Sequence, residues 1–195
     1  MRVNPQRQFL SQKCLPTYEY RRPESAQRFD DQSTVSIGDY KFSMADCIGK
    51  GSFSKVYSAK HNTTNEKVAV KVINTKSLKD KPSEDLLRNE MNTIKELHHP
   101  YILCCLDIYV IEATTYIVTE FCDSDLAKLI KNTGMLMRGT AYNFFVQIVK
   151  GYHHMRQKGY IHRDLKPANL LLRKNTIKIA DFGFSKVSLN SFPIK

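Results

Sequence analysis

The sequence has 195 residues, of which 42% are hydrophobic, 10% aromatic and 25% charged. These values lie near the globular average, so they exclude a collagen-like or fully disordered chain, and the length allows one domain or two small ones. The formal net charge is +11, and residues 123–195 carry most of it, with 13 basic and 4 acidic side chains. This skew fits an acidic partner, nucleic acid or an anionic membrane, or balancing acidic residues that lie outside the sequence.

No stretch approaches the roughly 18 uninterrupted apolar residues of a membrane-spanning helix, and the N-terminus lacks the apolar segment of a secretory signal. The five cysteines form no C-x-x-C pair. An odd number without that spacing argues against a disulfide framework or a zinc site and favours a reducing compartment. We therefore expect a cytoplasmic protein without a membrane span.

Residues 1–36 are rich in glutamine, arginine, serine and proline and have no apolar periodicity, so we expect a flexible tail there. A globular domain is expected over residues 37–195. Its first part, residues 37–122, is predicted to contain strands over 41–48, 56–60, 67–73, 102–111 and 115–121, and a helix from Ser83 to about Leu97.

The second part, residues 123–195, is predicted to be mainly helical. A short helix is expected from Asp123 or Ser124 through Lys131, and a long one over Arg138–Lys158, followed by short strands over 170–172 and 177–180. The long helix carries apolar residues at spacings of three and four, which predict a buried face: Ala141, Phe144, Phe145, Ile148, Val149, Tyr152 and Met155. Gly159 suits the position just after its C-terminus. The order predicts an α+β fold with two lobes, a small β-rich lobe with one helix and a mainly helical large lobe.

Gly49-Lys50-Gly51 lies between two expected strands. Glycines there allow backbone N–H groups to approach a phosphate, although a plain turn is the commoner explanation of such a pair. Ser54 takes the place of a third glycine and a strand follows, which argues against a Rossmann site, and no P-loop sequence is present.

Lys71 lies in the middle of the apolar strand Val68–Ile73. A buried ammonium needs an anion, and the alternative is an edge strand with this lysine in water. Glu90 lies on the apolar stripe of the following helix, three residues after Leu87, so each charge can explain the other.

His162-Arg163-Asp164-Leu165-Lys166-Pro167-Ala168-Asn169 gathers an acid, a base and an amide on a loop that Pro167 keeps from being helical. An aspartate can accept a hydroxyl proton, a lysine can neutralise a phosphoryl group, and an asparagine can coordinate Mg²⁺. Asp181-Phe182-Gly183 follows a strand and offers a second Mg²⁺ ligand, although such a tripeptide is also common in turns.

Together these elements resemble the eukaryotic protein kinase family in order and spacing, from Gly49 to Gly183. Lys166 two residues after Asp164 is similar to the serine/threonine type. The strings 166–169 and 179–186 also resemble the Unc-51-like, autophagy-initiating group. The resemblance implies an ATP- and Mg²⁺-dependent transfer of the γ-phosphate to a serine or threonine of a protein substrate.

The resemblance also implies roles for individual residues. The catalytic group would be Asp164, Lys166, Lys71 and Glu90. Mg²⁺ would be held by Asn169 and Asp181. The phosphates would meet the loop of Gly49, Lys50 and Gly51 as well as Lys71. Adenine would lie between Ile48, Val56, Ala69 and Leu171, beside the gatekeeper Thr119 and the hinge residues Glu120 and Cys122. Asp125 would contact the ribose.

Two departures from the family pattern concern Ser54 and Ala168, which replace a glycine and a glutamate, and we expect modest effects from both. A larger one is that no Ala-Pro-Glu follows Gly183 in this sequence, so the later helices of the large lobe are not expected. An inactive ATP-binding or partner-binding fragment is therefore the alternative function. A nucleic-acid-binding module is a third, weaker hypothesis, because the basic residues are scattered and no stacking platform is present.

Overall fold

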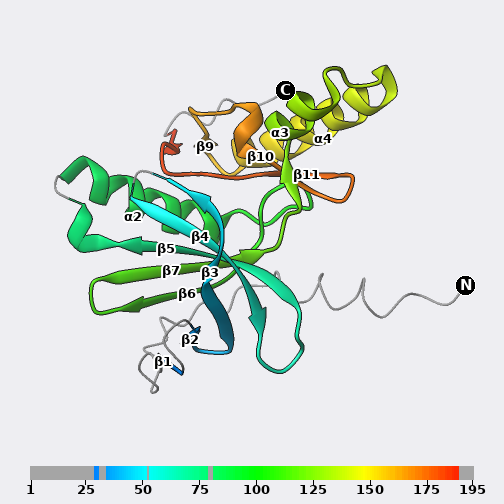
Figure 1. Ribbon diagram of the computed structural model, residues 1–195. Helices are drawn as coiled ribbons and strands as arrows, with labels where there is room; N and C mark the ends of the chain where they lie inside the picture. The colour runs from blue at the N-terminus through cyan, green and yellow to red at the C-terminus, as the bar shows by residue number, and fades with distance from the viewer. Residues whose placement is uncertain (1–28, 31–33, 52, 79–80, 189–195) are drawn as a thin grey trace, which may run out of the picture. The chain divides into compact units, whose positions relative to one another are not determined.

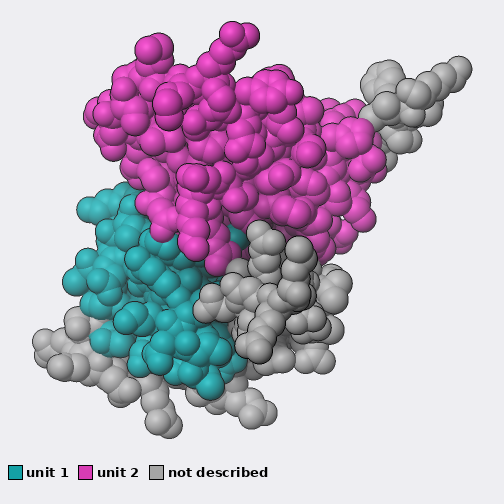
Figure 2. Space-filling model, turned by 90° about the vertical axis from the view of Figure 1, so that its right-hand side faces the viewer, with its two compact units in different colours: residues 1–84, 105–121 teal, residues 85–104, 122–195 magenta. Residues whose placement is uncertain are grey.

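The computed structural model describes residues 29–30, 34–51, 53–78 and 81–188. The chain forms two compact units, one made of residues 1–84 and 105–121 and the other of residues 85–104 and 122–195 (Figure 2). The division of the domain at residue 122 that the sequence suggests remains a prediction. Each unit is described separately.

The first unit is built on a seven-stranded sheet in the order β1-β2-β3-β4-β5-β7-β6, with antiparallel pairing throughout (Figure 1). Its strands are β1 (Phe29–Asp30), β2 (Thr34–Ile37), β3 (Tyr40–Lys50), β4 (Ser54–His61), β5 (Lys67–Asn74), β6 (Cys105–Ile111) and β7 (Thr114–Glu120). A 3₁₀ turn, η1 (Thr75–Ser77), follows β5. The strands expected around residues 41–48, 56–60, 67–73 and 115–121 are confirmed, whereas the one expected from residue 102 begins at Cys105.

Strands β1 and β2 lie largely within the segment that the sequence assigns to a tail. Val35 and Ile37 alternate with exposed or half-buried neighbours, and both are buried against the sheet. Two apolar residues are too few to give a visible period in the sequence. Gly38 makes the turn into β3 with a φ of +51°, and a β-carbon there would stand 2.4 Å from the hydroxyl of Tyr109, so the close approach requires glycine. The rest of the expected tail, residues 1–28 and 31–33, lies outside the described residues.

One face of this sheet forms the core of the first unit. Because side chains alternate along a strand, every second residue of β4, β5 and β7 points to this core. Its buried members are Val35, Ile37, Tyr40, Phe42, Tyr57, Ala59, Val68, Val70, Tyr109, Tyr116 and Val118. The hydroxyl of Tyr40 donates a hydrogen bond to the carboxylate of Asp107, and burial raises the pKa of this tyrosine.

The second unit holds most of helix α2 and the remaining elements. Its helices are α2 (Lys81–Glu96, whose first four residues group with the first unit), α3 (Leu126–Thr133), α4 (Arg138–Gln157) and the 3₁₀ turn η2 (Pro167–Asn169). Its strands are β8 (Ser124–Asp125), β9 (Tyr160–Ile161), β10 (Leu170–Arg173), β11 (Thr176–Ile179) and β12 (Lys186–Val187). They form a sheet in the order β11-β10-β8 and a separate pair, β12-β9.

The starts of two helices differ from the sequence prediction. Helix α2 begins at Lys81, so Ser83 lies in its first turn and is buried. Helix α3 begins at Leu126, because Ser124 and Asp125 instead pair with β10. The carboxylate of Asp125 then caps this helix by accepting a hydrogen bond from the backbone N–H of Lys128 at 2.8 Å.

Helix α4 packs on β11 through a face that includes small and polar residues. A β-carbon on Gly151 would stand 2.9 Å from Cδ1 of Ile179, so glycine permits the close approach of helix and strand. The side chain of Gln147 accepts a hydrogen bond from the backbone N–H of Ile177 at 2.7 Å and donates one to the carbonyl of Asn175. These bonds tie the helix to the hairpin that leads to Asp181.

The apolar residues of α4 extend beyond this packed face. Phe144 and Met155 are buried as predicted, whereas Phe145 is 63% exposed and Val149 48% exposed. Ala141 is exposed as well. The prediction of one buried face was therefore wrong for these three residues, because the apolar arc is wider than the face that β11 can cover. After the helix ends at Gln157, Gly159 has a φ of +82°, which confirms its predicted place.

Within the described part of the chain, every helix is too short or too polar to cross a membrane.

Candidate functional site

In the first unit, Lys71 stands on a central strand. Strand β5 pairs on one side with β4 and on the other with β7, so that Lys71 lies opposite Val56 and opposite Ile117. Its side chain is half-buried. The alternative of a lysine on an edge strand is therefore wrong.

The register also gathers the other predicted residues of this unit. Directly opposed residues of antiparallel strands point to the same face, so Val56 lies on the face of Lys71. Ala69, two residues before Lys71, shares that face, and so does its partner Thr119. This face is opposite to the apolar core of the unit. Glu120, at the end of β7, is buried.

The glycine-containing turn joins β3 to β4. Gly49 is paired with Val56 and Lys50 with Lys55, and the backbone N–H of Gly51 donates a hydrogen bond to the carbonyl of Ser54 at 2.8 Å. A β-carbon on Gly51 would stand 2.8 Å from Oγ of Ser54, which explains a glycine there. Ile48, before this turn, is 46% exposed and lacks a wall of neighbouring side chains within the sheet.

In the second unit, three predicted residues form one hydrogen-bonded group. The ammonium of Lys166 lies 2.8 Å from Oδ2 of Asp164. The side-chain amide of Asn169 donates to the same oxygen at 3.0 Å and to the backbone carbonyl of Asp164 at 2.9 Å. The sequence motif is thus a compact cluster in space.

The cluster shifts the acidity of its members. The hydrogen bond from Lys166 holds the pKa of the Asp164 carboxyl below its usual value, and the Asn169 amide acts in the same direction. Reciprocally, Asp164 raises the pKa of Lys166. Both side chains are therefore charged at neutral pH. A carboxylate in this state can accept a proton from a hydroxyl group.

His162 positions this loop, a role that the sequence did not reveal. Its ring is fully buried and lies 5.5 Å from the ring of Phe182, centroid to centroid. Nδ1 accepts the backbone N–H of Asp164 at 3.3 Å, which assigns the proton to Nε2, and Nε2 donates to the carbonyl of Ala180 at 3.0 Å. The imidazole thus joins the segment of Asp164 to that of Asp181.

The backbone bends sharply at both acidic segments. Arg163 and Asp181 each have a φ of +66°, a left-handed conformation that is unusual for residues other than glycine. Nε of Arg163 donates to the carbonyl of Phe184 at 2.6 Å, and the backbone N–H of Ala180 donates to the carbonyl of Asn169 at 2.9 Å. Asp181 is exposed while Phe182 is fully buried, so the bend directs the carboxylate to the surface.

Two predicted residues have further surroundings of interest. Glu90 is buried on α2, as its place on the apolar stripe predicts, and its pairing with Lys71 stays a prediction. The carboxylate of Asp125 caps α3 and lies 3.0 Å from the ammonium of Lys128, so its ribose contact stays a prediction beside a structural role. Leu171, opposite Asp125 on β10, and Cys122 are half-buried.

A metal could be held only with the help of a ligand. The described residues contain no group of three or more histidine, cysteine, aspartate or glutamate side chains placed to bind an ion. Mg²⁺ is commonly bound by one or two protein side chains together with phosphate oxygens and water. Asn169 and Asp181 fit such a site, since they supply an amide and a carboxylate from adjoining segments.

A strand lysine over a glycine-containing turn, with a loop of aspartate, lysine and asparagine followed by Asp-Phe-Gly, defines a kinase-type catalytic domain. Comparison with known families supports this assignment: the family model "Protein kinase domain" matches residues 42–192. The chain belongs to the protein kinase family, and its α+β fold is that of a two-lobe kinase domain with few helices.

Its curated relatives are named as serine/threonine protein kinases. The chain is 38% identical over 165 residues to serine/threonine-protein kinase ULK1 of Homo sapiens, a match that covers 78% of this chain and 16% of that protein. It is 35% identical over 152 residues to the carbon catabolite-derepressing protein kinase of Saccharomyces cerevisiae, covering 77% and 24%. It is 33% identical over 148 residues to serine/threonine protein kinase OSK3 of Oryza sativa, covering 75% and 29%. The chain thus spans less than a third of the length of each of these relatives.

Proposed function

We propose that the chain forms the nucleotide and catalytic region of an ATP- and Mg²⁺-dependent serine/threonine protein kinase. The observation that carries this proposal is the group of Asp164, Lys166 and Asn169, in which a charged acid, a base and an amide share one oxygen. The relatives, named as serine/threonine kinases, support the type of acceptor. A protein hydroxyl is then the partner of Asp164, and we propose the cytoplasm as the location.

The residues of the second unit divide the work of phosphoryl transfer. A serine or threonine hydroxyl loses its proton to the Asp164 carboxylate as its oxygen forms a bond to the γ-phosphorus, and the bond from that phosphorus to the β-phosphate oxygen breaks. Lys166 balances negative charge on the transferred group. Asn169 and Asp181 hold Mg²⁺, which screens the charge of the phosphates when bound.

The first unit supplies the nucleotide-binding residues. Lys71 meets the α- and β-phosphates and pairs with Glu90, and the turn of Gly49, Lys50 and Gly51 covers the phosphates with its backbone. Val56, Ala69 and Thr119 share the face of Lys71, as the register requires, and form an adenine-binding surface with Ile48 and Leu171. Glu120 and Cys122 bind adenine through their backbone, and Asp125 contacts the ribose.

The test is transfer of labelled phosphate from ATP to a mixture of serine- and threonine-containing peptides. We expect Lys71→Met and Asp164→Asn to lower the rate by at least about a hundredfold, because each removes a charge that acts on the reacting groups. Lys60→Met is the matched control, since Lys60 is an exposed lysine on β4. Equal rates for all four proteins would contradict the proposal.

A second candidate is a domain that binds Mg-ATP without transferring phosphate. The exposed apolar residues of α4 favour it, because Phe145 and Val149 leave one face of this helix without packing. Thermal stabilisation by Mg-ATP, measured on the same proteins, distinguishes the two functions. Stabilisation that Lys71→Met abolishes, without any phosphate transfer, would establish the second candidate in place of the first.

A further inference from the structure

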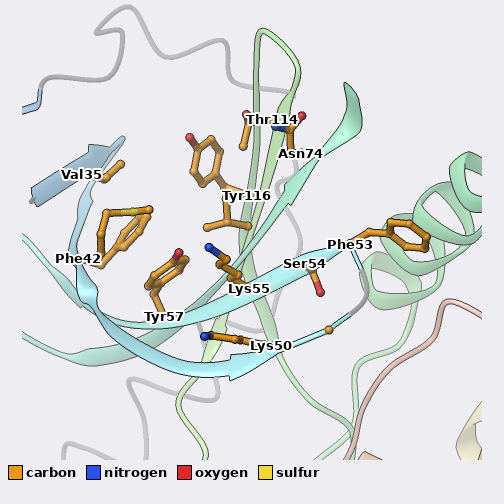
Figure 3. A pocket seen from close by; sticks show the side chains of 13 residues that line it. Val35, Phe42, Lys50, Phe53, Ser54, Lys55, Tyr57, Asn74, Thr114 and Tyr116 are labelled. Carbon is orange, nitrogen blue, oxygen red and sulfur yellow. The ribbon is translucent and has the colours of Figure 1, made fainter. Parts of the chain in front are cut away.

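A hollow of about 480 Å³ lies on the first unit, within its sheet and the turns at its end (Figure 3). It is lined by Val35, Phe42, Met44, Lys50, Gly51, Phe53, Ser54, Lys55, Tyr57, Val72, Asn74, Thr114 and Tyr116. This volume lies in the range of ligand-binding sites in proteins, about 300–1,000 Å³.

The hollow is separate from the candidate nucleotide face. Lys55, Val72 and Tyr116 are directly opposed across β4, β5 and β7 and therefore point to one face. Lys71 adjoins Val72 on the same strand, and side chains of consecutive strand residues point to opposite faces. A ligand in the hollow would thus contact the side of the sheet that faces away from Lys71.

The floor of the hollow is apolar and largely aromatic. Phe42 and Tyr57 have ring centroids 5.0 Å apart, and both are buried together with Tyr116. In Figure 3 these rings stand around the side chain of Lys55, which reaches in among them. Aromatic surfaces of this kind bind large apolar side chains and favour a nearby cation.

Two lysines give the hollow its charge. Lys50 and Lys55 are directly opposed at the end of the β3–β4 ladder, and both are exposed. Like charges in this arrangement repel one another, and an anion between them relieves the repulsion. None of the described residues that line the hollow is acidic, so a neutralising group has to come from elsewhere.

A second set of opposed lysines shows what the hollow adds. Lys60 lies opposite Lys41 and opposite Lys67, and all three are exposed, but none lines the hollow. Opposed lysines alone can be a solvated surface. The combination with an aromatic floor is found at Lys55 and not at Lys60, which makes Lys60 a matched control.

We propose that this hollow binds a partner protein through a short acidic segment that carries one large apolar side chain. The apolar side chain fills the aromatic floor, and carboxylates next to it meet Lys50 and Lys55. Complementary charge gives such a contact its specificity, while burial of the apolar group supplies much of the affinity. The contact does not depend on phosphate transfer, so the proposed kinase function and this site can fail separately.

The probe is a fluorescein-labelled pentapeptide with a central phenylalanine and two glutamates on each side, titrated with the full chain by fluorescence anisotropy. We expect saturable binding that weakens as salt is added. Lys55→Glu should weaken it by about tenfold or more, because it reverses one of the two charges. Met44→Glu, at an exposed position on the rim, should weaken it by a similar factor, whereas Lys60→Glu should change it by less than about twofold.

Two altered peptides test the two halves of the recognition. Replacing the phenylalanine by alanine should abolish saturation, and so should replacing the glutamates by lysines. Circular dichroism and urea unfolding of each variant establish that it is folded, and Met44→Glu serves as the second variant if Lys55→Glu is not.

Several results would overturn the proposal. They are the absence of saturable binding at about 1 mM protein, equal loss of binding in Lys55→Glu and Lys60→Glu, and equal binding of the lysine peptide. A change of sedimentation coefficient in Lys55→Glu would assign the hollow to a second copy of the chain instead. Faster hydrogen exchange of residues 1–28 in Lys55→Glu, without probe binding, would assign it to the chain's own N-terminal segment.

Discussion

In the first unit the candidate site residues stand on the middle strands of a sheet, whereas in the second they stand on loops between short elements. Lys71 and Thr119 are placed by the ladder of β4, β5 and β7. Asp164 and Asp181 are placed by bends with positive φ at Arg163 and at Asp181 itself. The first arrangement is determined by register, and the second by a few specific hydrogen bonds and one buried ring pair.

The difference predicts how each half responds to change. A sheet distributes its stability over many backbone hydrogen bonds and a shared core, so a surface change in it has little effect. A loop held by single contacts loses its geometry when one contact is removed. The predictions below test this contrast, from the largest expected effect to the smallest.

The largest effect is expected at Phe182, which anchors the second acidic segment. Its side chain is fully buried and packs against His162. We expect Phe182→Ala to lower the free energy of unfolding by about 4 kcal/mol, because it leaves a cavity beneath the loop. Phe184→Ala, at a position 49% exposed, should cost less than about 1 kcal/mol. Urea unfolding followed by circular dichroism measures both, and equal losses would mean that the loop has no such anchor.

A somewhat smaller effect is expected at Ile37 on β2, which is fully buried in the core of the first unit. Ile37→Ala should lower the free energy of unfolding by about 3 kcal/mol through lost burial and a residual cavity. Ser36→Ala, on the other face of the same strand, should change it by less than about 0.5 kcal/mol. If Ile37→Ala proved as mild as Ser36→Ala, strand β2 would not belong to the folded sheet.

An intermediate effect is expected at Asp125, which caps α3. Asp125→Ala removes the acceptor of the Lys128 N–H and should cost about 1 kcal/mol in thermal or urea unfolding. Asp125→Asn keeps an acceptor and loses only the ion pair to the exposed ammonium of Lys128, so it should cost clearly less. A larger loss in the asparagine variant than in the alanine variant would show that charge, not capping, is the stabilising factor.

The smallest effect concerns pH and the stacked rings of His99 and His154, whose centroids are 5.1 Å apart. Burial lowers the pKa of both below 6.5, and nearby positive groups add to this. The groups concerned are His154, Lys178 and Lys150 around His99, and Lys158, His98 and His153 around His154.

The sign follows from the protons bound in each state. Below pH 6.5 the unfolded chain binds protons at these rings before the folded one does, so stability should fall as the pH drops through that value towards the folded pKa. Stability should be complete above it. His154→Gln should flatten this dependence in unfolding measured between pH 5 and 8, and His153→Gln, an exposed neighbour on the same helix, should leave it unchanged. A steeper dependence in His154→Gln would contradict the assignment.

Much of the sheet could be predicted because strand alternation is a local property. The segment 67–73 was recognisable from its β-branched residues, and its central place in the sheet follows once β7 pairs with it. Residues 34–37 were not recognisable, because a strand of four residues with two apolar positions has no distinctive period and depends on β3 for its existence. The helix starts at Lys81 and Leu126 were missed for a related reason: at residue 124 pairing with β10 overrides the local preference for a helix.

The face of α4 shows the limit of periodicity most clearly. Phe144 and Phe145 have the same hydrophobicity, but only Phe144 faces β11 and is buried. Gln147, which a hydrophobic pattern would place outside, is buried because it satisfies the backbone of the neighbouring hairpin. An apolar pattern specifies which residues can be buried, and the neighbouring elements select among them.

The amino-acid sequence by itself determined the family and the chemical identity of the site, because the residue types at Lys71, Asp164, Asn169 and Asp181 and their spacing carry that information. Only the tertiary structure decided that Lys71 stands on a central strand and that a buried histidine joins the two acidic segments. It also decided that Lys55 stands over an aromatic hollow while Lys60 does not. The physical reason is that motifs depend on residue type and order, whereas burial, register and charge neighbours depend on segments that are distant in the chain.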